Sequence, residues 1–220
     1  SSTVGGWLAQ GGSGYGSWEY GEFTDNVLSA KAVLGDGSVK TFSKEELPLL
    51  AETEGTTGII TEVTLETRPH GPVSVRLVGM QNPEQLERFV TAVKELPIWS
   101  LSFVNPNMVR LTNRVPLRTH HGHPVEERVE FPEQYLVLLA FREQDHPQVD
   151  GRLTNLSNEI GAAVLPEELA HHEWEQRFNI MKVKRLGPSL VPAEVVIPLD
   201  SLAETLEQID KKITQPIVIE

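Results

Sequence analysis

The start of the chain has the residue type and spacing that suit a phosphate-binding turn. Residues 3–16 read TVGGWLAQGGSGYG, and six of these fourteen residues are glycine. Glycine lets backbone N–H groups come close to a ligand and adopt positive φ, and successive N–H groups can form a nest for an anion. Glycine motifs are also common in plain surface turns. The residues alone leave both interpretations open.

Two groups of histidines could bind a metal or move a proton. His120, His121 and His123 lie in THHGHP, where Gly and Pro indicate a loop and no carboxylate is present, so we expect a solvated loop without a metal. His171 and Glu175 would share a helix face at spacing i,i+4, and a polar helix surface is the favoured interpretation.

Cationic side chains cluster late in the chain. Arg177 could hold a carboxylate in its planar fork, or stack on Trp174 three residues earlier. Lys182, Lys184 and Arg185 could steer an anionic substrate or pair with surrounding acids. Both pairs of alternatives stay open.

Composition excludes several classes of protein. The 220 residues include 19 Lys+Arg and 31 Asp+Glu, a net charge of −12, which argues against binding nucleic acid or anionic membranes. No apolar run approaches the ~20 residues of a membrane span. The absence of cysteine excludes disulfides, thiolate catalysis and Cys-ligated metals from this chain. No signal-peptide pattern is present, and we expect a cytoplasmic protein.

Glycine distribution predicts a domain boundary. Eleven of the 17 glycines lie within residues 1–70. Two prolines and a glycine in Arg68–Pro72 would stop any regular element, so we place the break there, between segments 1–70 and 71–220.

The first segment is predicted to form strands 27–34 and 39–42 around an Asp-Gly turn, and strand 58–65. Ser43 and Glu46 have the spacing of a capping box that opens a short helix.

The second segment is predicted to alternate strands with amphipathic helices, which indicates an α+β fold with helices on one face of a sheet. The predicted strands are 73–77, 136–141, 195–198 and 216–219. One predicted helix starts at Asn82-Pro83 and runs to Val93, and a second contains Leu153, Leu156 and Ile160. A third is capped by Asp200, and its apolar face is formed by Leu202, Leu206, Ile209 and Ile213.

Several spaced motifs together resemble one family. They are TVGG at 3–6, SG at 13–14, YG at 20–21, DNV at 25–27, DG at 36–37 and EGTTGIITE at 54–62. In this order they resemble the vanillyl-alcohol-oxidase/PCMH-type FAD-dependent oxidoreductases, particularly the glycolate oxidase subunit and D-lactate dehydrogenase branch. Residues 70–220 are similar to that branch's cap (substrate) domain, through WEQR at 174–177, KRLGP at 184–188 and EVVIP at 194–198.

The resemblance implies an enzyme that transfers hydride from a 2-hydroxy acid to FAD. The Thr3–Gly14 loop would line the pyrophosphate and flavin, Tyr20 and Gly21 would shape an adjoining turn, and the Gly55–Ile60 loop would meet the adenosine end. The implied cofactor-binding residues are Thr3, Gly5, Gly6, Gly12, Ser13, Gly14, Tyr20, Gly21, Gly55, Gly58, Ile59 and Ile60. Arg177 would hold the substrate carboxylate.

Two family features are absent from these 220 residues: the other phosphate-binding loop and the histidine-rich stretch that supplies the catalytic base and metal ligands. We therefore expect a central fragment, comprising the second half of an FAD-binding domain and an incomplete cap domain with an antiparallel sheet. By itself it would bind FAD weakly. Its partners would be the 2-hydroxy acid and a missing FAD-domain half or an electron-accepting subunit. The alternative is a non-catalytic, partner-dependent module that retains the cap fold.

Overall fold

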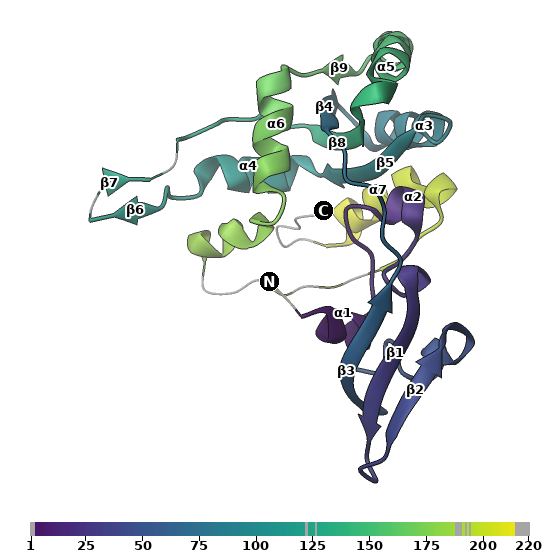
Figure 1. Ribbon diagram of the computed structural model, residues 1–220. Helices are drawn as coiled ribbons and strands as arrows, with labels where there is room; N and C mark the ends of the chain where they lie inside the picture. The colour runs from purple at the N-terminus through teal and green to yellow at the C-terminus, as the bar shows by residue number, and fades with distance from the viewer. Residues whose placement is uncertain are drawn as a thin grey trace. The chain divides into compact units, whose positions relative to one another are not determined.

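The computed structural model describes residues 3–121, 123–125, 127–187, 191, 193 and 195–213 (Figure 1). The chain divides into two compact units, Ser1–Gly71 and Pro72–Glu220. This division falls within the stretch 68–72, where two prolines and a glycine interrupt regular structure.

The first unit is a three-stranded antiparallel sheet with short helices. The strands β1 (Val27–Leu34), β2 (Val39–Ser43) and β3 (Gly58–Leu65) have the order β2-β1-β3. The helical segments are α1 (Val4–Gln10), α2 (Ser17–Tyr20), η1 (Thr24–Asn26) and η2 (Lys44–Leu49). Leu8 of α1 packs with Val27, Ala32 and Phe42 of the sheet, so α1 closes the small core of this unit.

The predicted hairpin, the strand 58–65 and the capping box are confirmed in this unit. Ser43 N–H donates to Glu46 Oε2 at 3.1 Å, although Pro48 follows and the helix is of the 3-10 type. The expected loop over Thr3–Gly14 is wrong for residues 4–10, which form α1. The hydroxyl of Thr3 caps this helix by accepting from Gly6 N–H at 3.0 Å, and complete burial of Leu8 stabilises it.

The second unit is built on a four-stranded antiparallel sheet in the order β5-β8-β4-β9. Its strands are β4 (Val73–Met80), β5 (Ile98–Val104), β8 (Tyr135–Arg142) and β9 (Ala163–Val164), and a separate hairpin pairs β6 (Thr119–His120) with β7 (His123–Pro124). The helices are α3 (Pro83–Val93), α4 (Pro106–Arg114), α5 (His146–Ile160), α6 (Glu167–Gln176) and α7 (Leu202–Lys212), with 3-10 segments η3 (Glu143–Asp145), η4 (Ile180–Leu186) and η5 (Leu199–Ser201).

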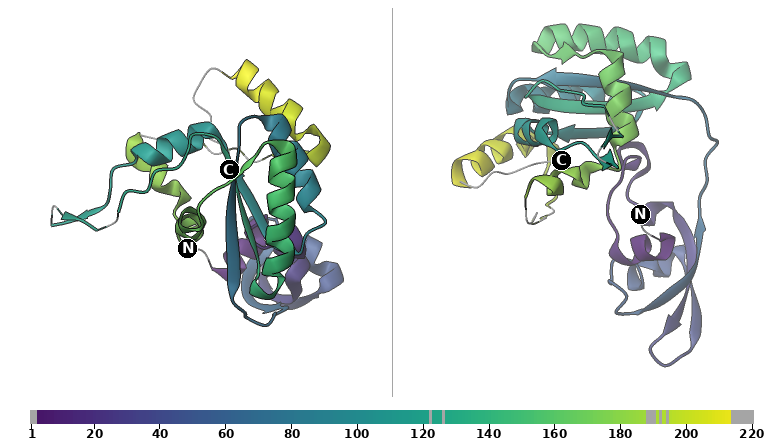
Figure 2. Two further views of the ribbon diagram at one scale, coloured as in Figure 1. Left: turned by 90° about the horizontal axis from the view of Figure 1, so that it is seen from above. Right: turned by 90° about the vertical axis from the view of Figure 1, so that its left-hand side faces the viewer.

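Helices cover both faces of this sheet, which corrects the expectation of one covered face. On one face, Val75 and Leu138 pack with Val109 of α4 and Ala170 of α6. Side chains alternate along a strand, so Phe141 lies on the opposite face, where its ring centroid is 6.1 Å from that of His146 of α5. The right-hand view of Figure 2 shows α5 and α4 on opposite sides of the sheet.

Three predictions near the end of the chain have different outcomes. Residues 195–198 form no strand, and Val195 and Val196 are exposed rather than buried in a sheet. The helix α7 is present, but its N-cap is Ser201 rather than Asp200, and Glu87 of α3 accepts from Ala203 N–H at 2.8 Å in its first turn. The predicted strand 216–219 lies outside the described residues.

Strand 73–80, helices 83–93 and 146–160, and strand 135–142 confirm the other predicted elements of this unit. Within the described ranges, no helix has both the length and the apolar character needed to cross a bilayer.

Candidate functional site

The glycine-rich turn of the first unit is held in place by two aromatic rings. Trp7 of α1 stacks on Phe23 with ring centroids 4.6 Å apart, and a Cβ at Gly14 would lie 3.2 Å from the Trp7 ring. Phe23 N–H donates to Gly12 O at 3.3 Å, and Gly14 N–H donates to Ser17 Oγ at 2.8 Å. These contacts fix the path of residues 11–14 between α1 and α2.

Gly12 is the point at which this turn suits an approaching phosphate. Its φ is +106°, and a Cβ there would meet no atom within 4 Å, so its backbone is sterically open. Gly11 is less suitable, because the side chain of Glu52 lies against it: a Cβ at Gly11 would come 2.2 Å from Glu52 Cγ. A carboxylate here repels a phosphate. The open position in this turn is therefore Gly12, whereas the Gly14 N–H already donates to Ser17 Oγ.

The structure brings two distant motifs of the first unit together. A Cβ at Gly5 would lie 3.4 Å from Ile60 Cβ, so the start of α1 packs directly on β3. Beside it, Ile59 is 72% exposed, on a strand at the edge of the sheet described for this unit. Gly58 permits this strand to approach its neighbour, since a Cβ there would be 2.8 Å from Val33 O.

The other predicted cofactor residues have structural roles of their own. Thr3 and Gly6 form the cap of α1. Tyr20 O accepts from Asn26 Nδ2 at 2.9 Å, and the guanidinium of Arg68 lies 4.0 Å from the centroid of the Tyr20 ring. Gly21 and Gly55 have φ values of +73° and +80°, which glycine adopts without strain.

Arg177 follows α6 in the second unit and stacks on two rings. Its guanidinium carbon is 3.9 Å from the Trp174 centroid and 4.5 Å from that of Phe178, and Nη1 donates to Trp174 O. The stacked alternative for Trp174 and Arg177 is therefore present in the structure. Stacking uses the faces of the guanidinium, whereas a carboxylate binds in its plane, so the two roles are compatible.

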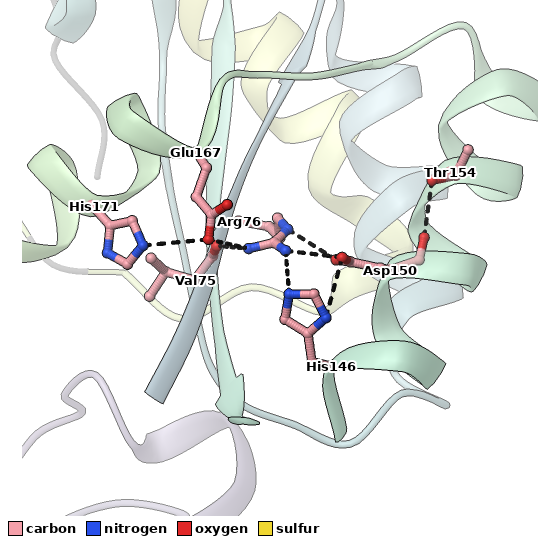
Figure 3. Close-up of polar contacts among 7 residues, drawn as sticks. All are labelled: Val75, Arg76, His146, Asp150, Thr154, Glu167 and His171. Atoms are coloured by element: carbon pink, nitrogen blue, oxygen red, sulfur yellow. Dashed lines mark hydrogen bonds and ion pairs between the residues drawn. The ribbon is translucent and has the colours of Figure 1, made fainter. Parts of the chain in front are cut away.

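A buried arginine network in the second unit was missed by the sequence analysis (Figure 3). Arg76 of β4 is 8% exposed, and its Nε and Nη2 donate to the two carboxylate oxygens of Asp150 on α5, both at 2.9 Å. Nη2 is 2.6 Å from His146 Nε2, and Nη1 is 3.3 Å from Glu167 Oε1. Because Glu167 begins α6, the network ties α6 to the sheet and to α5. Alternation along the strand 73–77 predicts that Arg76 points to the polar face of that strand. No signal in the sequence shows that α5 covers this face.

The two histidine groups lie on different kinds of surface. His120 and His123 pair across the β6–β7 hairpin and are exposed with His121. His171 Nε2 lies 3.4 Å from Glu167 Oε1, one turn back, whereas Glu175 was the predicted neighbour. Within the part of the chain that the structure describes, no group of three or more His, Asp or Glu side chains is placed to hold a metal ion.

One acidic group on α6 is perturbed by its surroundings. Burial raises the pKa of the Glu173 carboxyl, while Lys182 and His172 act in the opposite direction. Since burial is the larger effect, this carboxyl holds its proton more tightly than an exposed glutamate does.

Comparison with known proteins shows what the start of the chain is similar to. Residues 1–43 match the sequence family described as FAD binding domain. The start of the chain is thus similar to an FAD-binding domain, and FAD is the cofactor that such a domain indicates.

Two curated relatives are FAD-linked oxidoreductase apf9 of Gibberella fujikuroi and alkyldihydroxyacetonephosphate synthase of Dictyostelium discoideum. The first is 34% identical over 98 residues, which cover 41% of this chain and 17% of that protein. The second is 32% identical over 117 residues, which cover 50% and 18%. The matched part of the chain thus spans less than a fifth of either relative.

Two solved structures of alkyldihydroxyacetonephosphate synthase share the fold. One has a TM-score of 0.60 at 19% identity and covers 84% of this chain and 38% of that chain. The other has a TM-score of 0.58 at 17% identity and covers 83% and 35%. The relatives are thus FAD-linked oxidoreductase and synthase proteins, and the comparisons do not single out the glycolate oxidase and D-lactate dehydrogenase branch.

Proposed function

We propose that this chain is part of an FAD-dependent oxidoreductase, in which residues 3–60 contact the cofactor and the second unit contacts the substrate. The observation that carries the proposal is the open backbone at Gly12, within the segment that matches the FAD-binding family. A flavin bound there would accept the hydride, a reaction for which protein side chains have no suitable group. The residues of the chain would bind and orient.

We propose a 2-hydroxy acid as the substrate, with Arg177 as the residue that holds its carboxylate. The rings of Trp174 and Phe178 fix the plane of the guanidinium, which removes part of the entropy cost of ordering a long side chain. A carboxylate held in that plane by two hydrogen bonds would have a defined orientation. Each charge-assisted hydrogen bond contributes about 1.5–3 kcal/mol.

A second candidate substrate, a phosphate ester, follows from the relatives. The relative from Dictyostelium discoideum is named as the synthase of alkyldihydroxyacetonephosphate, and it is 32% identical over half of this chain. By its name, that compound is a phosphate ester. A phosphorylated substrate would still need a cation, but its charge and geometry differ from those of a carboxylate.

Anaerobic reduction of the FAD-containing parent protein, of which we propose this chain is a part, distinguishes these candidates. We expect glycolate or D-lactate to bleach the visible flavin absorbance. Arg177→Lys should impair this reaction, because lysine lacks the two-pronged geometry, and Arg177→Met should impair it further. Lys94→Met, which removes an exposed cation at the end of α3, is the control and should have no effect.

The melting temperature separates a substrate role from a structural one. If Arg177 only stacks on Trp174, Arg177→Met lowers the melting temperature and leaves the reduction rate of the folded protein unchanged, which would contradict the substrate role. Reduction by a phosphate ester but not by a 2-hydroxy acid would favour the second candidate. Protein that takes up FAD but is reduced by neither would favour a non-catalytic module.

A further inference from the structure

A pocket of about 280 Å³ lies in the second unit, between the end of α4, the segment 127–131 and η4. Three cations line it: Arg128, Lys182 and Arg185. Among the described residues that line the pocket, Glu127 is the one carboxylate and the three cations outnumber it, in a chain whose net charge is −12. The walls also include the amide side chains of Gln176 and Asn179 and the apolar side chains of Val129 and Phe131.

The wall formed by 127–131 is fastened to α4 by hydrogen bonds. Asn113 Nδ2 donates to Phe131 O at 2.8 Å, and Phe131 N–H donates to Asn113 Oδ1 at 3.0 Å. Arg128 donates through Nη1 to Asn113 O and through Nη2 to Val115 O at 3.3 Å. The cation of Arg128 is therefore held at the pocket by the same contacts that hold the wall.

Among the described residues, Lys182 is the lining cation whose side chain makes no hydrogen bond to a backbone carbonyl of the kind that holds the two arginines. Arg185 Nη1 donates to Pro116 O at 2.7 Å, so both arginines bind carbonyl groups near the end of α4. Lys182 is half-buried and lines the pocket, and its charge lowers the pKa of the Glu173 carboxyl, which burial raises. His172 also lines the pocket.

We propose that this pocket binds a small organic oxyanion, with the anionic group at Lys182 and Arg128 and a short apolar group against Val129 and Phe131. A phosphate monoester and a carboxylate share this chemistry. The proposal goes beyond the function proposed above, because it requires neither FAD nor Arg177, which does not line the pocket. The opposing account is that Arg128 and Arg185 serve only to bind the carbonyl groups of residues 113–116.

Titration of the protein without FAD, followed by backbone amide NMR at constant ionic strength, tests the proposal. The probes are butyl phosphate, pentanoate and inorganic phosphate. We expect saturable shifts at residues 127–131 and 176–182 with butyl phosphate or pentanoate, and whichever binds more tightly identifies the anionic group. Butyl phosphate should bind more tightly than inorganic phosphate, by about fourfold for each methylene that the pocket buries.

Lys182→Gln should weaken binding by about tenfold or more, the loss expected for one charge-assisted hydrogen bond. Lys184→Gln is the matched control, because Lys184 lies on the same η4 segment, is exposed and does not line the pocket. Equal weakening in both variants would show a general charge effect and would overturn the proposal. Failure of both butyl phosphate and pentanoate to saturate, or no preference for the butyl group, would overturn it too.

Discussion

Replacing Asp150 by asparagine should destabilise the second unit more than removing its partner Arg76 does. Asp150→Asn keeps the shape of the side chain but removes the charge that neutralises a guanidinium of which only 8% is exposed. Arg76→Met removes the cation itself and leaves an apolar side chain of similar length in a covered position. The two variants therefore separate the cost of an uncompensated buried charge from the contribution of the ion pair.

The structure sets the size of the effect. Removing one partner of a fully buried pair costs about 3–5 kcal/mol. The Asp150 side chain is 35% exposed, and the exposed Glu167 remains 3.3 Å from Arg76, so some compensation persists. We therefore expect Asp150→Asn to lower the free energy of unfolding by about 2–3 kcal/mol and Arg76→Met by about 1 kcal/mol.

Urea unfolding measured by tryptophan fluorescence would check this. A background with Trp7→Phe and Trp18→Phe leaves Trp99 and Trp174, which are in edge-to-face contact in the second unit, as the reporters. Glu159→Gln removes an exposed carboxylate from the same helix as Asp150 and is the control. The reasoning is refuted if Asp150→Asn stays within about 0.5 kcal/mol of the control, or if Arg76→Met is the more damaging change.

Two further substitutions have expected outcomes that depend on local geometry. Burial raises the pKa of the Glu173 carboxyl in the folded state. The protonated carboxyl therefore contributes stability that is fully present below the ordinary pKa of 4.5, and this stability is lost as the pH rises through the raised pKa. Glu173→Gln should therefore raise the free energy of unfolding at neutral pH, and a pH series in which this gain over wild type fails to shrink below pH 4.5 would be inconsistent with the burial argument. Gly58→Ala should lower the melting temperature more than Gly79→Ala, because its Cβ would lie 2.8 Å from the backbone oxygen of Val33, whereas Gly79 faces the flexible side chain of Gln134 at 2.7 Å. Differential scanning calorimetry would compare the two, and equal losses would show that the strand pairing at Gly58 yields as easily as a side chain does.

Local patterns were enough to predict many elements but not their tertiary surroundings. The spacing of Leu86, Phe89, Val90 and Val93 identified α3, and the Asp-Gly turn identified the β1–β2 hairpin, because both signals lie within a few residues. Helices on both faces of the second sheet went unrecognised, since alternation along β4 shows a polar position at Arg76 but not the Asp150 that covers it from 74 residues away.

The candidate site shows the same division. The glycine positions in the turn were evident from the sequence, whereas the closing of that turn by Trp7 on Phe23 and the packing of Gly5 on Ile60 are tertiary contacts. The strand predicted at 195–198 was wrong because an apolar, β-branched run indicates a strand only when a neighbouring strand is available to pair with it.

Titration of the protein with FAD, followed by backbone amide NMR, tests the central claim most directly, because it detects weak binding residue by residue. The account predicts shifts at Gly12, Ser13 and Gly14 and at Ile59 and Ile60, and Gly12→Ala should weaken binding, since a Cβ there strains a backbone whose φ is +106°. Glu52→Gln should strengthen binding by removing the carboxylate beside Gly11. Shifts confined to other residues, or FAD binding that Gly12→Ala leaves unchanged, would contradict the assignment of the glycine turn to the cofactor.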